Sequence, residues 1–172
     1  MTATTKTAEA DAESEAASDR RQSLLATDEQ EEEPSPSRRT HSLVIVANRL
    51  PARKVTRGDK SQWELSPGGL VSALTPVLEK TKGAWVGWSG AAGEAPAPFT
   101  LNGIRNQPLS LTKCDIERFY EGFSNRTIWP LYHDAVRPPE YRRRWWAPYV
   151  DVNQRYADAA AKTAAKGAAV WI

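Results

Sequence analysis

The stretch Leu43–Pro51, with the sequence LVIVANRLP, decides the fold. Its first five residues are apolar and three of them are β-branched, which predicts a strand covered on both faces, as in a parallel sheet. Pro51 has no N–H to donate and therefore ends the ladder of hydrogen bonds. Asn48 and Arg49 then lie at the carboxyl end of a buried parallel strand, the edge at which open α/β sheets bind their ligands.

Arg49 is the first candidate binding residue of the chain. Its guanidinium keeps its charge, and its forked donors match the oxygens of a phosphate or a carboxylate. The alternative is an arginine that only solvates the end of a strand. The stretch by itself leaves both interpretations open, because a single charged residue at a strand end is a common feature of surfaces.

Composition and charge limit the class of protein. A length of 172 residues is enough for about one domain. Residues 1–40 hold 10 acidic and 5 basic side chains, a net charge of −5, so the total of +2 leaves +7 for residues 41–172. A basic globular part indicates an anionic ligand. The single cysteine, Cys114, excludes an internal disulfide and a metal site of several cysteines, and it favours the cytoplasm.

The N-terminal region is predicted to be a disordered tail. Residues 1–41 are mostly Ala, Ser, Thr, Glu and Asp, so they cannot bury enough surface to offset their ordering entropy. They lack the apolar core of a secretory signal, and no run approaches the roughly 18 apolar residues of a membrane span. We therefore expect a tail at 1–41, one globular unit at 42–172, no membrane partner, and neither a metal nor another cofactor.

A pair of glycines before a helix is the second candidate. Polar residues predict a mobile loop at 53–61, and 63–65 is expected to be a short extended piece. Gly68 and Gly69 then precede apolar residues with helical spacing, and Pro76 should bend this helix. Without a Cβ, the two glycines let an anionic ligand approach free backbone N–H groups at the positive end of the helix. A plain turn is the alternative.

Two further strand regions follow. Residues 84–90, with the sequence AWVGWSG, alternate large with small side chains and predict a strand with a glycine exit. Trp85 and Trp88 should lie on opposite faces of it, one in the core and the other able to line a cleft. Phe99–Leu111 is predicted to form a strand pair around the turn Asn102-Gly103. Thr112 and Asp115 then resemble a capping box at the start of a helix.

The segment Phe119–His133 combines many aromatic residues with short polar ones. Sites for sugars pair an aromatic plane with groups that bind hydroxyls, so this composition indicates a sugar site. An ordinary aromatic core in a helix is the alternative.

The last part of the chain predicts a helix and a strand. Arg142, Arg143 and Arg144 before two tryptophans form either a surface for nucleic acid or a solvated helix start over a buried indole pair. We favour the second interpretation and expect no nucleic-acid partner. Helical spacing from Pro148 leads to Gly167, and residues 168–172 are expected to form another buried strand.

Taken in order, five motifs resemble the trehalose-6-phosphate synthases over about residues 43–172. They are VANRLP at 46–51, GGL at 68–70, WVGWSG at 85–90, the aromatic segment at 119–133 and the run from Trp145 to Asn153. The resemblance implies an α/β fold of two Rossmann-like lobes with the active site between them, the GT-B arrangement. Residues 42–172 would then be a truncated N-terminal, acceptor-side lobe.

The resemblance also implies roles for individual residues. Arg49 would hold the phosphate of the acceptor sugar, and Trp88, Tyr120 and Trp129 would form the acceptor site, with Tyr120 reaching that phosphate. Gly69, with Gly68 beside it, would offer a backbone donor near the phosphate of the departing nucleotide.

The implied reaction transfers glucose from a nucleotide-glucose, expected to be UDP-glucose, to glucose 6-phosphate with retention. It uses no enzyme nucleophile and depends on positive charge around the diphosphate. The family's catalytic Asp and His and its donor-binding Arg and Lys would lie beyond Ile172. We therefore expect no catalytic residue and no turnover in this piece alone, and a possible homo-oligomer at full length. The alternative is a non-catalytic sugar-phosphate-binding module or partner subunit.

Overall fold

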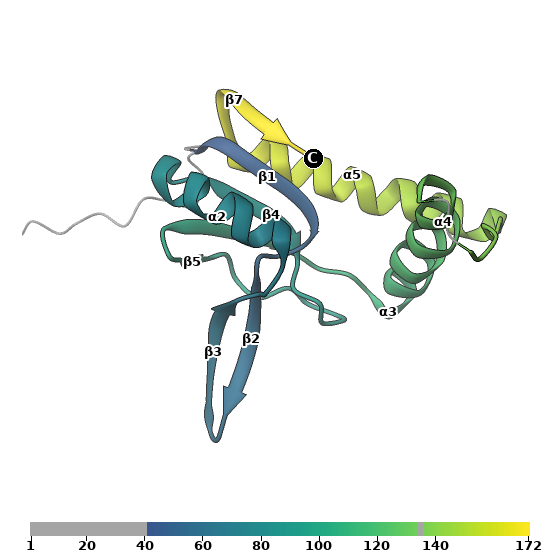
Figure 1. Cartoon of the computed structure of the whole chain (residues 1–172), viewed down its shortest axis with the longest axis horizontal. Helices are drawn as coiled ribbons and strands as arrows, with labels where there is room; N and C mark the ends of the chain where they lie inside the picture. Colours follow the sequence, from purple (N-terminus) through teal and green to yellow (C-terminus); the bar gives the residue numbers. More distant parts are fainter. Residues whose placement is uncertain (1–40, 134–135) are drawn as a thin grey trace, which may run out of the picture. The chain divides into compact units, whose positions relative to one another are not determined.

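A five-stranded sheet forms the centre of the fold. The computed structural model describes residues 41–133 and 136–172. The strand order is β5-β6-β4-β1-β7, and every neighbouring pair is parallel except β5 with β6. The strands are β1 (His41–Arg49), β4 (Ala84–Trp88), β5 (Phe99–Leu101), β6 (Ile104–Leu109) and β7 (Ala164–Trp171) (Figure 1). The predicted parallel α/β sheet, with β1 inside it, is confirmed.

Alternating side chains of the sheet build a core on each face. Val44 and Val46 of β1 belong to one cluster, with residues from α5 (Trp146–Thr163) and Phe119. Ile45 belongs to the other cluster, together with residues from α2 (Gly69–Thr81). Because successive residues of a strand point to opposite faces, one apolar strand holds both helices in place.

The two tryptophans of β4 follow the same rule. Trp85 is in the cluster under α2 and Trp88 in the cluster under α5, which confirms that they lie on opposite faces. Both are buried, at 1% and 3% exposure, so neither is an open wall of a cleft. The turn Asn102-Gly103 is also confirmed, since both residues have positive φ between β5 and β6.

A β-hairpin replaces the loop that the sequence predicts at 53–61. Strands β2 (Ala52–Arg57) and β3 (Lys60–Leu65) pair antiparallel, and Gly58 takes a positive φ of 62° in the turn. The ring of Trp63 stacks on Phe99 of β5, with centroids 4.4 Å apart, and ties the base of the hairpin to the sheet. Figure 1 shows the ribbon as a separate pair of strands. The hairpin β2–β3 is held by its cross-strand pairing and by one stacked tryptophan. It therefore contains few apolar residues, and its sequence resembles that of a loop.

Strand β7 corrects a second expectation. It pairs with β1 at the edge of the sheet, and its end is exposed, with Val170 at 44% and Trp171 at 57%. The sequence predicts a buried strand here, because Ala, Val and Trp are the residues of a strand with neighbours on both sides. In the described part of the chain the second neighbour is absent.

The connection from the sheet to α5 is helical. It contains α3 (Lys113–Asp115), the π-helix η1 (Ile116–Ile128), α4 (Trp129–Tyr132) and the 3-10 turn η2 (Arg143–Trp145). The sequence predicts ordinary helical spacing for η1, whereas its bonds join residues five apart, as from the N–H of Trp129 to the carbonyl of Ser124. A Cβ at Gly122 of η1 would lie 2.9 Å from the ring of Trp145 in η2, so the glycine allows η1 and η2 to come into contact.

Arg142, the first arginine of the basic cluster before α5, contacts a neighbouring carboxylate and a buried indole. Arg142 bonds the carboxylate of Glu140 at 3.2 Å, and its guanidinium carbon lies 5.5 Å from the centroid of Trp145. Trp145 is buried, but Trp146 is 55% exposed. The predicted helix start over a buried indole is therefore right for the first tryptophan and wrong for the second.

Two further expectations concern the N-terminal tail and membrane-spanning segments. The predicted tail lies outside the described residues, except that His41 opens β1. Within residues 41–133 and 136–172, no helix combines the length and apolar character that a membrane crossing requires.

The capping box at the start of α3 gives a test of stability. Thr112 and Asp115 exchange hydrogen bonds of 2.9 and 3.1 Å, and Arg155 of α5 bonds the same carboxylate at 2.9 Å. Replacing Asp115 with asparagine removes the ion pair, and we expect the free energy of unfolding to fall by about 1 kcal/mol at pH 7. Urea denaturation measures it. Asp151→Asn is the matched control, because Asp151 pairs with the same arginine but is 69% exposed.

This effect should depend on pH with a definite sign. Burial raises the pKa of Asp115, but the hydrogen bonds from Thr112 and Arg155 outweigh burial and hold the pKa below its ordinary value. A lowered pKa in the folded state stabilises the protein above the unfolded pKa, about 4, and this contribution is lost as the pH falls through the folded value. Wild type and Asp115→Asn should therefore converge in acid. An equal difference at pH 7 and pH 2 would contradict the assignment.

Candidate functional site at the carboxyl edge of the sheet

Three of the predicted site residues form one contiguous group. Arg49 ends β1, and its guanidinium carbon lies 4.9 Å from the ring centroid of Trp88 at the end of the neighbouring strand β4. The Trp88 ring meets the ring of Tyr120 edge-on, with centroids 5.6 Å apart and an interplanar angle of 65°. A cation over an indole face is attracted by the ring electrons, which orients Arg49. Among residues 41–133 and 136–172, no carboxylate forms an ion pair with it.

Backbone contacts between β1 and β4 hold this group in position. The indole N–H of Trp85 donates to the Arg49 carbonyl at 3.0 Å, and the N–H of Leu50 donates to the Trp88 carbonyl at 2.9 Å. The guanidinium lies against Gly90, where a Cβ would overlap its atoms. The glycine exit of β4 therefore has a purpose, since it leaves room for the Arg49 side chain to turn across the strand end.

Trp88 packs beneath the site and does not face solvent. Its indole N–H donates to the Ala91 carbonyl at 2.6 Å, which fixes the ring, and the residue is 3% exposed. Arg49 itself is exposed. The group therefore exposes the Arg49 guanidinium to solvent, next to the partly buried phenol of Tyr120 and over the fixed indole of Trp88.

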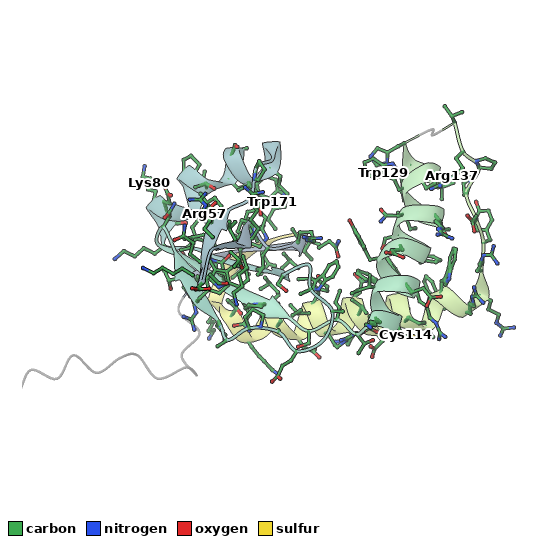
Figure 2. All side chains as sticks on the ribbon, turned by 90° about the horizontal axis from the view of Figure 1, so that it is seen from below. Arg57, Lys80, Cys114, Trp129, Arg137 and Trp171 are labelled. Carbon is green, nitrogen blue, oxygen red and sulfur yellow. The ribbon has the colours of Figure 1, made fainter. Side chains whose placement is uncertain are left out.

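Trp129 lies apart from this group in the described contacts. It belongs to α4 and is 54% exposed, and its ring stacks on His133 with centroids 3.5 Å apart (Figure 2). The ring contacts found in the described part of the chain join it to His133 and to none of Arg49, Trp88 and Tyr120. Its place in an acceptor site stays a prediction.

The glycine pair lies where the sequence places it, at the start of α2. Gly68 is the N-cap and Gly69 the first helical residue, and the first helical bond runs from the Ser72 N–H to the Gly68 carbonyl at 2.9 Å. No side chain caps this end, and a Cβ on either glycine would meet only open space. In the part of the chain that the structure describes, this helix start has no side-chain cap, which is what an anion site on the first-turn N–H groups requires.

Sequence reasoning missed a polar contact beside this edge. The Tyr156 hydroxyl of α5 donates to the Asn48 carbonyl at 2.7 Å, and burial raises the pKa of that phenol, against the opposing effects of the Trp88 backbone and the Arg155 and Arg49 charges. The helical spacing predicts Tyr156 as an inward-facing residue but carries no signal of a partner 108 positions away. The contact fixes the backbone directly before Arg49.

The described residues contain no group of three or more His, Cys, Asp or Glu side chains that could hold a metal ion.

Comparisons with known proteins point to one family. The model of glycosyltransferase family 20 matches residues 41–172. The trehalose-6-phosphate synthase of Mycolicibacterium smegmatis is 49% identical over 134 residues, which cover 77% of this chain and 27% of that protein. The chain thus spans about 27% of the length of that relative.

Solved structures agree with the fold. The UDP-forming alpha,alpha-trehalose-phosphate synthase of Burkholderia vietnamiensis superposes with a TM-score of 0.61 at 28% identity, covering 77% of this chain and 27% of that one. The corresponding enzyme of Burkholderia xenovorans, solved in complex with glucose-6-phosphate, gives a TM-score of 0.58 at 25% identity, with coverages of 75% and 27%.

Proposed function

Because the chain belongs to glycosyltransferase family 20, we propose that it is the acceptor-side part of a trehalose-6-phosphate synthase. The complete enzyme transfers glucose from UDP-glucose to glucose 6-phosphate with retention, in the cytoplasm. The observation that carries this proposal is the group of Arg49, Trp88 and Tyr120 at the carboxyl edge of the sheet. The related Burkholderia xenovorans enzyme was solved with glucose-6-phosphate, which supports the acceptor.

Each residue then has a distinct task. The Arg49 fork binds the acceptor phosphate, and the Tyr120 hydroxyl adds a donor to the same group. The N–H groups at Gly69 and the residues after it face the phosphates of the nucleotide, which the helix dipole stabilises as charge develops on the leaving group. Trp129 covers the sugar when the second lobe is present. The cationic residues that clamp the donor belong to the remaining length of the family, so the 172 residues alone should bind acceptor without turnover.

Calorimetry with the 172-residue chain tests the proposal. Glucose 6-phosphate should give saturable heat, whereas glucose at the same concentrations should bind far more weakly, because it lacks the phosphate that Arg49 would contact. No heat with glucose 6-phosphate up to millimolar concentration would contradict the acceptor assignment.

The hydroxyl of Tyr120 provides a finer test. Tyr120→Phe keeps the edge contact with Trp88 and loses only the donor, so we expect about a 10-fold weaker affinity for glucose 6-phosphate and an unchanged midpoint of thermal unfolding. Tyr141→Phe is the control, since Tyr141 is 73% exposed and lies outside the group. Equal affinities in both variants would remove Tyr120 from the phosphate site.

A further inference from the structure

The ladder between β1 and β4 is interrupted directly before Arg49. Val46 of β1 pairs with Val86 of β4. The next pair is Arg49 with Trp88, so β1 advances by three residues where β4 advances by two. A bulge of this kind leaves the extra residue unpaired and re-aims the side chains beside it. The hydrogen bonds described above hold the backbone at Arg49 and Leu50, and the bulge before them needs a partner of its own.

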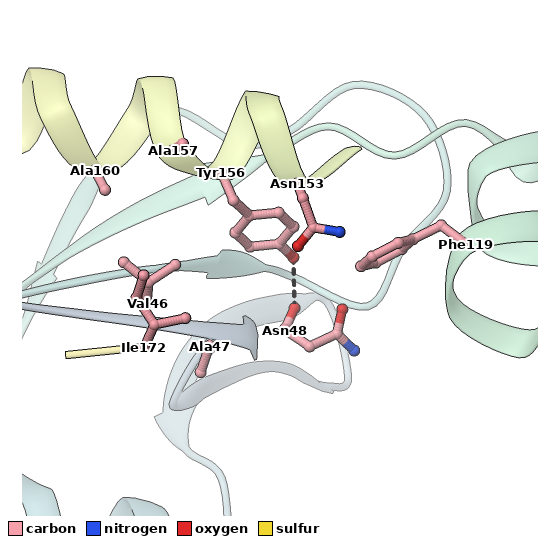
Figure 3. Close-up of a pocket in the computed structure, with 9 residues that line it drawn as sticks. All are labelled: Val46, Ala47, Asn48, Phe119, Asn153, Tyr156, Ala157, Ala160 and Ile172. Atoms are coloured by element: carbon pink, nitrogen blue, oxygen red, sulfur yellow. Dashed lines mark hydrogen bonds between the residues drawn. The ribbon is translucent and has the colours of Figure 1, made fainter. Parts of the chain in front are cut away.

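The Tyr156 hydroxyl of α5 is that partner. It donates to the Asn48 carbonyl at 2.7 Å, and Figure 3 shows the phenol reaching from the helix to this oxygen. Burial raises the pKa of the phenol, so the hydroxyl keeps its proton and stays a donor. The Trp88 backbone acts on the same hydroxyl in the opposite sense, as a hydrogen bond to its oxygen does. One hydroxyl therefore links the bulge of β1 with the end of β4.

The ring and the hydroxyl of Tyr156 have separate roles. The residue is 6% exposed and lies in the apolar cluster under α5, with its ring centroid 6.3 Å from that of Phe119. A phenylalanine would give the same packing, and a hydroxyl among apolar side chains is unfavourable unless it is hydrogen-bonded. Packing alone therefore does not explain the hydroxyl. Asn48 and Phe119, the two residues that Tyr156 meets here, directly precede Arg49 and Tyr120 in the sequence.

We propose that Tyr156 is a positioning residue of the phosphate site. Its hydroxyl holds the bulge of β1 against α5, which keeps the Arg49 guanidinium over the Trp88 ring and directed at the acceptor phosphate. The inference rests on the proposed function for the identity of the ligand. The orientation of Arg49 can be measured without any ligand, so the two can fail separately.

Tyr156→Phe tests the proposal, because the substitution keeps the ring and removes only the hydroxyl. Calorimetry with glucose 6-phosphate should show about a 10-fold weaker affinity than that of the wild-type chain. Nuclear magnetic resonance of the isotope-labelled, ligand-free chain should show a shifted Arg49 Nε–Hε signal, which a purely structural loss elsewhere in the core would leave in place. Arg49→Ala should bind equally weakly with and without Tyr156→Phe, since a positioning residue acts only through the residue that it positions.

Two variants of α5 serve as matched controls. Tyr149→Phe removes the hydroxyl of another tyrosine of this helix, whose ring stacks on Phe119 with centroids 5.8 Å apart. Val152→Ala opens a void in the cluster that holds the Tyr156 ring and leaves the hydroxyl in place, so it should lower the melting temperature. Both variants should bind glucose 6-phosphate with wild-type affinity and leave the Arg49 signal unchanged. Thermal unfolding confirms that each variant is folded.

The outcomes separate positioning from a general loosening of the core. Wild-type affinity in Tyr156→Phe would overturn the proposal, and so would an equal loss of affinity in Val152→Ala. A further loss when Tyr156→Phe is added to Arg49→Ala would also overturn it, because the hydroxyl would then act through another contact. If the wild-type chain itself binds no glucose 6-phosphate, the proposed function fails, and the Arg49 signal alone decides whether Tyr156 positions the guanidinium.

Discussion

Arg49→Ala is expected to weaken the affinity of the chain for glucose 6-phosphate by about 100-fold while leaving the fold intact. A bidentate, charge-assisted contact to phosphate contributes about 2–3 kcal/mol, which corresponds to this ratio. The fold should survive because Arg49 is exposed and its packing role is confined to the Trp88 face. Calorimetry measures the affinity, and thermal unfolding checks stability.

Three further variants isolate the cause. Arg49→Lys keeps the charge without the fork and should lose about 10-fold. Gly90→Ala leaves Arg49 in the sequence but places a Cβ where the guanidinium lies, so it should weaken binding as well. Arg57→Ala on the hairpin is the matched control, because that arginine is 72% exposed and pairs with Glu64. If Arg49→Ala bound glucose 6-phosphate as Arg57→Ala does, the phosphate would have to bind elsewhere.

The elements that the sequence predicts well are those whose signal is local. The apolar run of β1, the helical stripe of α2, the turn at Asn102-Gly103 and the capping box at Thr112 each need only a few neighbouring residues to form. Their outcome matches the prediction because tertiary packing and local preference favour the same conformation.

The misses have a different origin. Hairpin β2–β3 is stabilised by its cross-strand pairs and by one stacked tryptophan, so its charged sequence looks like a loop. The exposure of β7 depends on which strand lies next to it, which its own residues do not encode. The apolar spacing of η1 is that of an ordinary helix, so it carries no signal of the π-helical bonds that the structure shows.

The residues of the candidate site also differ in whether a local pattern or long-range packing brings them together. Arg49 and Trp88 end adjacent parallel strands, so a correct sheet places them together. Tyr120 joins them through a helix whose position no local pattern specifies. The aromatic composition of residues 119–133 included Tyr120 in a candidate sugar site, and the resemblance to a family singled it out. The contact between Tyr156 and Asn48 spans 108 residues and had no signal at all.

Gly87→Ala should have the largest effect on stability of any small substitution in the sheet. A Cβ at this buried position of β4 would lie 2.8 Å from the Arg49 carbonyl carbon and the Leu50 nitrogen, and these backbone atoms have little freedom to move. The register of β1 against β4 shifts between Val46 and Arg49, and Gly87 allows the two backbones to approach at that irregularity.

We expect Gly87→Ala to lower the free energy of unfolding by about 3 kcal/mol, as overpacking against backbone does, and to lower the melting temperature by roughly 10 °C. Urea and thermal denaturation measure both. Gly69→Ala is the matched control, because the same methyl group meets open space at the start of α2 and should leave the stability unchanged or slightly raised. Since the displaced atoms belong to Arg49 and Leu50, Gly87→Ala should also weaken glucose 6-phosphate binding in the molecules that remain folded. Equal unfolding midpoints for the two variants would show that β1 and β4 can separate at little cost, and the rigid support inferred for Arg49 would then be wrong.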